Sequence, residues 1–129
     1  MIRLYCDAAR QQHSGVSTAG AIVIVNKQQQ QFKTTLGLLP DNHAAEFAAL
    51  LWILQQLSLQ DAMLTIYVDS KIVADSLNKQ YAKHYQAYVD DIWLILNQVK
   101  FVSIEWISEK ENLGAHHLAL QMLHQKNKS

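Results

Sequence analysis

The stretch AMLTIYVDSKIVADSLN, residues 62–78, decides the fold class of this chain. Residues 62–69 form a near-continuous apolar run, which is typical of a central strand covered on both faces. Residues 70–78 have the pattern of a short helix, and Ser70 is placed to cap it. Asp69 lies at the junction, where the strand ends and the helix begins. A buried strand that runs directly into a helix predicts an α/β fold, in which ligands gather beyond the carboxyl ends of the strands.

The segments before and after this stretch also have strand and helix patterns. We expect strands at 1–7, 19–25, 31–38 and 101–108, and helices at 43–57, 84–99 and 113–125. Between the second and third strands lies KQQQQF, residues 27–32, which we expect to be the polar turn of an antiparallel hairpin. This order of elements predicts a mixed sheet with helices on its faces.

Length and composition indicate an ordinary globular chain of 129 residues. We expect a single domain at 1–125, followed by a polar tail at 126–129. Eleven basic and eleven acidic residues cancel, so binding to nucleic acid would need a local patch. The single cysteine, Cys6, cannot form an intrachain disulfide and suits a reducing, cytoplasmic location. No signal peptide and no apolar run of about 18 residues is recognisable, so we expect no membrane association.

Three acidic residues are the candidates for chemistry, because glycine-rich phosphate loops, a nucleophile elbow and an H-E-x-x-H motif are all missing. We expect Asp7 and Asp69 at strand ends, and Glu46 in the first turns of a helix, at the flank of its apolar stripe. Singly, each has an ordinary explanation as a turn former, a helix cap or a partner of the helix dipole. Together, three converging carboxylates would repel one another, and a divalent cation removes that repulsion. Oxygen ligands indicate Mg²⁺ or Mn²⁺.

The chain resembles the type 1 ribonuclease H family in four stretches that follow in the family's order. They are LYCDAA (4–9), DNHAAEFAAL (41–50), IYVDSKIVADSLN (66–78) and ENLGAHHLAL (111–120). The resemblance implies a ribonuclease H-like α/β fold: a five-stranded mixed sheet, with strands one to three antiparallel and helices on both faces. It also implies a monomeric endonuclease that hydrolyses the RNA strand of RNA/DNA hybrids with two metal ions, Mg²⁺ or Mn²⁺.

The same resemblance assigns roles to residues of this sequence. Asp7, Glu46 and Asp69 would be catalytic metal ligands. Substrate contacts would come from Asn42, His43, Ser70 and Lys71.

The sequence departs from the family pattern at several positions. The family's fourth carboxylate is replaced by His116, and its usual glycine after the first aspartate by Ala8. Trp106 lies nearest to the position of a family histidine that has no counterpart here. Some members have an extra lysine-rich helix, the basic handle, which grips the hybrid. It is missing here, and only Lys79, Lys83 and His84 resemble part of it.

The last helix raises the question of what His116 does. The core stripe of this helix consists of Ala115, Leu118, Ala119, Met122 and Leu123. His116 lies at the edge of that stripe, roughly 90° from its centre, while His117 points to solvent. His116 is then either a fourth metal ligand, which would favour Mn²⁺, or a structural residue that is hydrogen-bonded to a carboxylate.

Three functions stay open from the sequence. The first is the active endonuclease. The second is a ribonuclease H-like binding protein with weak or lost catalysis, which the neutral charge and His116 favour. The third is a nuclease of the same fold that acts on another nucleic acid.

Overall fold

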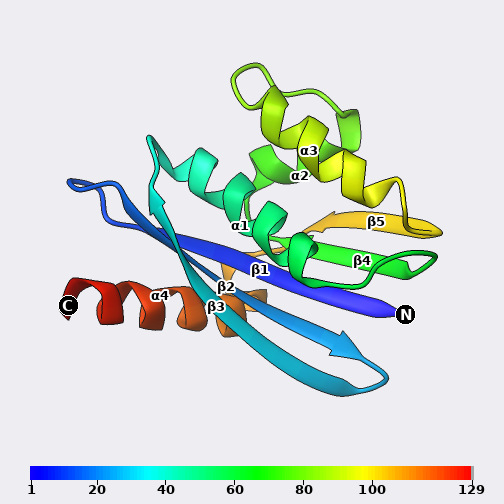
Figure 1. The fold of residues 1–129 in the computed structure, drawn as a ribbon, viewed down its shortest axis with the longest axis horizontal. Helices are drawn as coiled ribbons and strands as arrows, with labels where there is room; N and C mark the ends of the chain where they lie inside the picture. Colours follow the sequence, from blue (N-terminus) through cyan, green and yellow to red (C-terminus); the bar gives the residue numbers. More distant parts are fainter. Residues whose placement is uncertain (129) are drawn as a thin grey trace.

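The computed structural model describes residues 1–128, and its five strands form one mixed sheet in the order β3-β2-β1-β4-β5 (Figure 1). The strands are β1 Ile2–Arg10, β2 Val16–Val25, β3 Gln28–Leu38, β4 Met63–Val68 and β5 Phe101–Trp106. The first three are antiparallel neighbours, whereas β4 runs parallel to both β1 and β5. The predicted α/β class and the five-stranded mixed sheet are confirmed.

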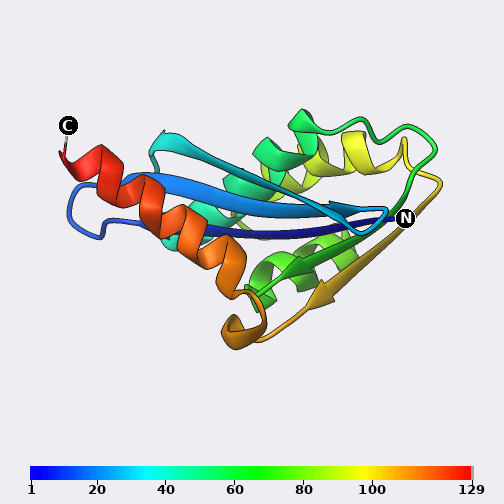
Figure 2. The same cartoon turned by 90° about the horizontal axis from the view of Figure 1, so that it is seen from below.

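Helices cover both faces of this sheet, as expected (Figures 1 and 2). They are α1 Asn42–Gln56, α2 Lys71–Lys79, α3 Gln86–Leu96, the 3₁₀ helix η1 Glu109–Glu111 and α4 Leu113–Lys128. The main core lies between the sheet and α1, α2 and α3. On the opposite face α4 packs mainly on β1, β2 and β3. No helix described within residues 1–128 has the length and apolar character needed to cross a bilayer.

The main core is built by alternate residues of the central strand. Leu4 and Cys6 of β1 are buried against Phe47 and Leu50 of α1. Each large apolar side chain removed from water in this way contributes about 1.5–3 kcal/mol. The intervening side chains of β1, including Asp7, emerge on the side of α4.

Asp7 does not end the first strand, contrary to expectation. β1 continues for three residues beyond it, because Asp7 still pairs with Gly20 of the antiparallel strand β2. The parallel pairing of β1 with β4 does stop earlier, at Tyr5 and Tyr67. The edge of β1 that faces β4 is therefore open at Asp7.

The expected turn at residues 27–32 is also wrong. Gln28 pairs with Val25, and the glutamines that follow belong to β3. The turn consists of Asn26 and Lys27 alone, both with positive φ (53° and 66°), as two-residue hairpins with a primed turn require. Pairing with β2 holds the polar run extended, and its side chains are exposed to solvent.

Three smaller differences concern element ends and coverage. β4 alternates buried with half-buried or exposed residues, because α4 packs mainly on the other strands of the second face. α3 spans only residues 86–96 and β5 ends at 106. α4 continues to residue 128, so most of the expected polar tail is helical, and Ser129 lies outside the described residues.

Candidate active site

Three carboxylates from separate elements meet at one end of the sheet. Asp7 lies in β1, Glu46 in α1, and Asp69 directly follows β4. Each offers one carboxylate oxygen, and these oxygens lie within 4.8 Å of one another. The fold thus brings together the three acidic residues that the sequence singled out.

The register of two parallel strands places the two aspartates side by side. Tyr5 of β1 is paired with Tyr67 of β4, and their rings stack with centroids 4.6 Å apart. Asp7 and Asp69 each follow their tyrosine by two residues. They therefore reach the same height at the carboxyl end of the parallel pair, where ligands gather in α/β sheets.

Glu46 is positioned by the start of α1. Asp41 caps this helix and accepts hydrogen bonds from the Ala44 backbone N–H, over 2.8 Å, and from the Tyr85 hydroxyl, over 2.9 Å. Glu46 lies one turn further along, where the backbone N–H of Ala8 in β1 favours the ionised form of its carboxylate and so lowers its pKa. The start of α1 thus places Glu46 next to β1.

The electrostatics of the cluster favour an added positive charge. Burial raises the pKa of Glu46 well above its usual value, and the neighbouring charges of Asp7 and Asp69 raise it further. Burial also raises the pKa of Asp69, although a hydrogen bond from Asn112 acts in the opposite direction. Burial is the main cause of the raised pKa of Cys6, and the negative charge of Glu46 adds to it. The ionised carboxylates are therefore costly without a counter-charge.

The three carboxylates fit a hard divalent cation. All the donor atoms are carboxylate oxygens, which is the ligand type that Mg²⁺ and Mn²⁺ prefer. Positive charge at this point would also favour the ionised forms that burial and mutual repulsion disfavour. Asp7, Glu46 and Asp69 are thus the residues that would hold such an ion.

His116 contacts the cluster through Asp7. Its Nδ1 lies 2.9 Å from Oδ2 of Asp7, and its side chain is 43% exposed. Because a carboxylate only accepts hydrogen bonds, Nδ1 is inferred to carry the proton, which leaves Nε2 as the free ring nitrogen. If His116 binds a metal ion, it does so through Nε2. His117 is exposed, as the helical spacing indicated.

Gly20 allows α4 to pack close enough to β2 for His116 to contact Asp7. Gly20 is the partner of Asp7 on β2, and a Cβ atom there would collide with the backbone of Ala115 and Ala119. The helix is held in place by the Thr18 hydroxyl, which donates to the Ala119 carbonyl over 2.7 Å. The close approach of α4 to β2 brings the side chain of His116 to Asp7.

Asn112 is a site residue to which sequence reasoning assigned no role. It is 1% exposed, and its Nδ2 donates to Oδ2 of Asp69 over 3.0 Å and to the Cys6 carbonyl over 2.9 Å. Both partners are acceptors, which fixes the orientation of the amide. Its Oδ1 is buried with no partner among the described residues. From sequence, an asparagine just before a helix looks like an ordinary cap, although Asn112 lies in the stretch 111–120 that resembles the family.

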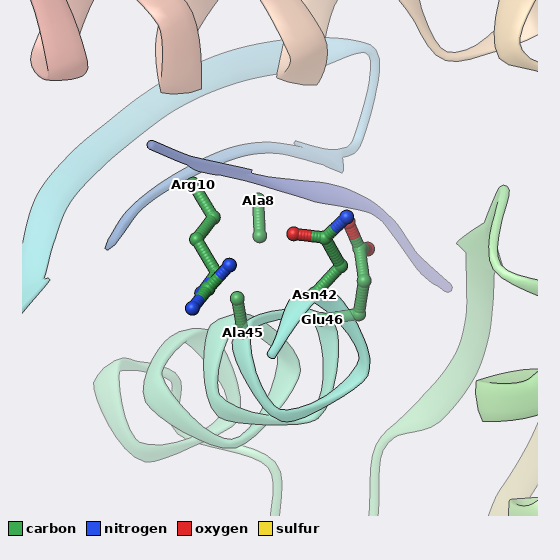
Figure 3. Close-up of a pocket in the computed structure, with 5 residues that line it drawn as sticks. All are labelled: Ala8, Arg10, Asn42, Ala45 and Glu46. Atoms are coloured by element: carbon green, nitrogen blue, oxygen red, sulfur yellow. The ribbon is translucent and has the colours of Figure 1, made fainter. Parts of the chain in front are cut away.

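Of the four expected substrate residues, Asn42 is the one that lies beside the carboxylate cluster. It shares a cavity of about 170 Å³ with Glu46, Arg10, Ala8 and Ala45 (Figure 3).

The other expected substrate residues are engaged in local contacts. His43 is exposed and lies edge-on to Tyr85, with ring centroids 6.1 Å apart. Ser70 caps α2 by accepting a hydrogen bond from the backbone of Val73 over 3.3 Å, and Lys71 is paired with Asp75 over 2.7 Å.

Two of the departures from the family pattern lie at Trp106 and in the loop after α2. The indole Nε1 of Trp106 donates to the Asp69 carbonyl over 3.1 Å, and the side chain is 56% exposed. This hydrogen bond holds the backbone of Asp69, one of the three clustered carboxylate residues. Only residues 80–85 separate α2 from α3, so this part of the chain has no additional helix to serve as a basic handle.

Comparisons with known proteins agree with this architecture. Residues 5–122 match the family model described as "Reverse transcriptase-like". A protein of Enterococcus faecalis named "Putative hydrolase EbsB" is 34% identical over 128 residues, which cover 95% of this chain and 94% of that protein.

Solved structures share the fold at lower sequence identity. Ribonuclease H1 from the archaeon Halobacterium salinarum superposes with a TM-score of 0.85 at 20% identity, covering 96% of this chain and 98% of that one. LC11 ribonuclease H1 in complex with an RNA/DNA hybrid gives a TM-score of 0.86 at 18% identity, covering 98% and 99%. The N-terminal ribonuclease H domain of rv2228c from Mycobacterium tuberculosis gives 0.82 at 20% identity, covering 93% and 96%.

Proposed function

The chain belongs to the reverse transcriptase-like family, as a member similar to type 1 ribonuclease H, and on that basis we propose that it hydrolyses the RNA strand of RNA/DNA hybrids. The observation that carries the proposal is the cluster of Asp7, Glu46 and Asp69, whose ligand oxygens lie within 4.8 Å of one another. Asn42 lies beside this cluster in a cavity that opens on Glu46.

Two divalent cations, Mg²⁺ or Mn²⁺, would activate the attacking water and stabilise the leaving 3′ oxygen. Asp7, Glu46 and Asp69 would hold these ions through their carboxylate oxygens. Hydrolysis breaks the bond between phosphorus and the 3′ oxygen, and leaves a 5′-phosphate and a 3′-hydroxyl.

Neighbouring residues orient the three carboxylates. Asn112 donates a hydrogen bond to one oxygen of Asp69, and His116 contacts one oxygen of Asp7. The backbone N–H of Ala8 lowers the pKa of Glu46. Such supporting hydrogen bonds typically change metal affinity or activity by about 10–100-fold. In this proposal His116 acts on the reaction through Asp7, and its Nε2 is the remaining candidate for a metal ligand.

A second candidate function is hybrid binding with weak catalysis. It is favoured by the replacement of a family carboxylate with His116 and by the net charge of zero. A third is cleavage of another nucleic acid by the same cluster.

One experiment separates these candidates. End-labelled RNA/DNA hybrid, double-stranded RNA and double-stranded DNA are incubated with the purified protein in Mg²⁺ and in Mn²⁺. Cleavage of the hybrid RNA alone supports the first function, and binding without cleavage supports the second. Cleavage of another substrate supports the third. Gel filtration and cell fractionation test the expected monomer and its cytoplasmic location.

A further inference from the structure

Arg10 is a cation that the fold holds in place beside the carboxylate cluster. It is the last residue of β1, and its Nε donates to the Leu39 carbonyl over 2.9 Å. Its Nη2 donates to the Pro40 carbonyl over 3.1 Å. The same loop is tied down by Leu39, whose N–H donates to the Gly15 carbonyl over 3.0 Å. A guanidinium fixed in this way loses little freedom when it binds a further acceptor.

The guanidinium shares a cavity with the cluster. Arg10 lines the cavity of about 170 Å³ that Glu46 and Asn42 also line. Figure 3 shows Arg10 on one side of this space and Asn42 and Glu46 on the other, with Ala8 and Ala45 between them. The two alanines are short, so the space between the cation and the cluster stays open to a ligand.

The charge of Arg10 has no carboxylate partner within the described part of the chain. No carboxylate lies within ion-pair distance of it among residues 1–128, where the ion pairs are Lys71 with Asp75 and His116 with Asp7. Its two partners are neutral carbonyls. A guanidinium has five N–H donors, so about three remain for a ligand. The site therefore offers an unpaired positive charge with several free donors.

We propose that Arg10 binds a phosphate of the cleaved RNA strand, next to the scissile phosphate and on the Glu46 side of the cluster. This inference rests on the proposed function. Guanidinium donors match phosphate oxygens, and a cation offsets the repulsion between the carboxylates and a nucleic-acid backbone. In a chain with a net charge of zero, such a contact supplies part of the local attraction that the overall composition does not.

The first test is the salt dependence of hybrid binding. The chain has two arginines, and Arg3 is exposed near the other end of β1, so Arg3→Gln removes the same charge away from the site. Binding of a fluorescent hybrid is measured by anisotropy without divalent cations, from low to moderate salt. Arg10→Gln is expected to lower the slope of log K against log salt by about 0.7–0.9, the value of one phosphate contact, whereas Arg3→Gln leaves it unchanged. Arg10→Lys keeps the charge and is expected to keep the slope.

The second test identifies the acceptor on the RNA. A hybrid with a neutral methylphosphonate beside the cleavage site is compared with one that has a 2′-deoxy substitution at the same nucleotide. The KM of the wild type is expected to rise about tenfold with the methylphosphonate hybrid. Arg10→Gln is expected to raise the KM for the unmodified hybrid by the same factor, and its KM should not rise further with the methylphosphonate hybrid. If only the deoxy substitution cancels the effect of Arg10→Gln, the phosphate assignment is wrong.

The outcomes also separate this inference from the proposed function. A slope for Arg10→Gln equal to that of the wild type overturns the Arg10 contact, even if the hybrid is cleaved. A lowered slope with no cleavage by the wild type overturns the proposed function and keeps the contact. A loss of folded protein changes the amplitude of binding rather than the slope, so thermal denaturation of each variant identifies that case. The wild type then carries the comparison: its slope with the methylphosphonate hybrid is expected to be lower by about 0.7–0.9 than with the unmodified hybrid, and an equal slope overturns the contact.

Discussion

The buried amide of Asn112 donates a hydrogen bond to Oδ2 of Asp69 over 3.0 Å, and so links the segment before α4 to the carboxylate that follows β4. The same amide donates to the backbone carbonyl of Cys6, in the strand that carries Asp7. One side chain thus connects the two parallel strands whose aspartates belong to the candidate active site. It also stabilises the ionised form of Asp69, which is the form that binds a cation.

Removal of this amide is expected to impair both stability and activity. Asn112→Ala leaves the buried Cys6 carbonyl without its partner, at a cost of about 1–3 kcal/mol in the free energy of unfolding. It also lets the pKa of Asp69 rise further, and hybrid cleavage should fall by about 10–100-fold. Urea denaturation and initial cleavage rates measure the two effects. Asn97→Ala, at an exposed position after α3, is the control, and equal effects of both variants would contradict the assigned role.

Loss of one carboxylate is expected to abolish cleavage. Asp69→Asn removes one of the three charged groups that would hold the cations, so 5′-phosphate products from the hybrid RNA should disappear. Asp91→Asn makes the same change at an exposed position of α3 and should cleave like the wild type. Cleavage that persists unchanged in Asp69→Asn would mean that another site or a contaminant produces it.

Cation binding should be visible without any activity measurement. Glu46→Gln is expected to stabilise the protein in chelator, because it removes one of three mutually repelling carboxylates. Addition of Mn²⁺ or Mg²⁺ should stabilise the wild type, by about 2.7 kcal/mol when the free cation is at about 100 times its Kd. Glu46→Gln should gain much less. Thermal denaturation with and without the cation measures both, and an equal gain in both proteins would argue against a site at Glu46.

Exchange of the histidine should change the metal preference. His116→Asp adds a carboxylate next to Asp7, so cleavage should shift from Mn²⁺ towards Mg²⁺, which prefers oxygen ligands. The same variant should be less stable in chelator, because a fourth carboxylate joins three others. The ratio of cleavage rates in the two metals is measured for the wild type, His116→Asp and the exposed-site control His117→Ala. An unchanged ratio in His116→Asp would make His116 structural only.

Acid should weaken the start of α1 through Asp41. The hydrogen bond from Ala44 lowers the pKa of Asp41, and the bond from Tyr85 adds to this. Because the folded-state pKa lies below the unfolded one, the stabilisation is present above the ordinary value of about 3.9 and is lost as the pH falls through the folded-state pKa. Asp41→Asn keeps a capping acceptor but should remove this pH-dependent part, whereas Asp41→Ala should cost about 1 kcal/mol at neutral pH. Urea denaturation across the acidic range measures both variants, and identical pH profiles for the wild type and Asp41→Asn would refute the role of the charge.

Several features of the fold were predictable because they depend on neighbours in sequence. Ser70 caps its helix, and the apolar stripe that begins at Ala115 faces the sheet, as the spacing indicated. The hairpin between the second and third strands was predicted, but its turn was expected at 27–32 and consists of Asn26 and Lys27 alone. A run of glutamines looks like a loop by composition, and only pairing with β2 holds it extended.

The sequence by itself determined the α/β class, the positions of most helices and strands, and the identity of the three carboxylates. These follow from periodicity, capping and charge, which act over a few residues along the chain. Only the tertiary structure decided that Asn112 reaches Asp69, that Gly20 lets α4 bring His116 to Asp7, and that Arg10 lies across a cavity from Glu46. The physical reason is that each of these contacts depends on strand register and on the approach of a helix to the sheet. Both are set by packing between segments that lie far apart in sequence.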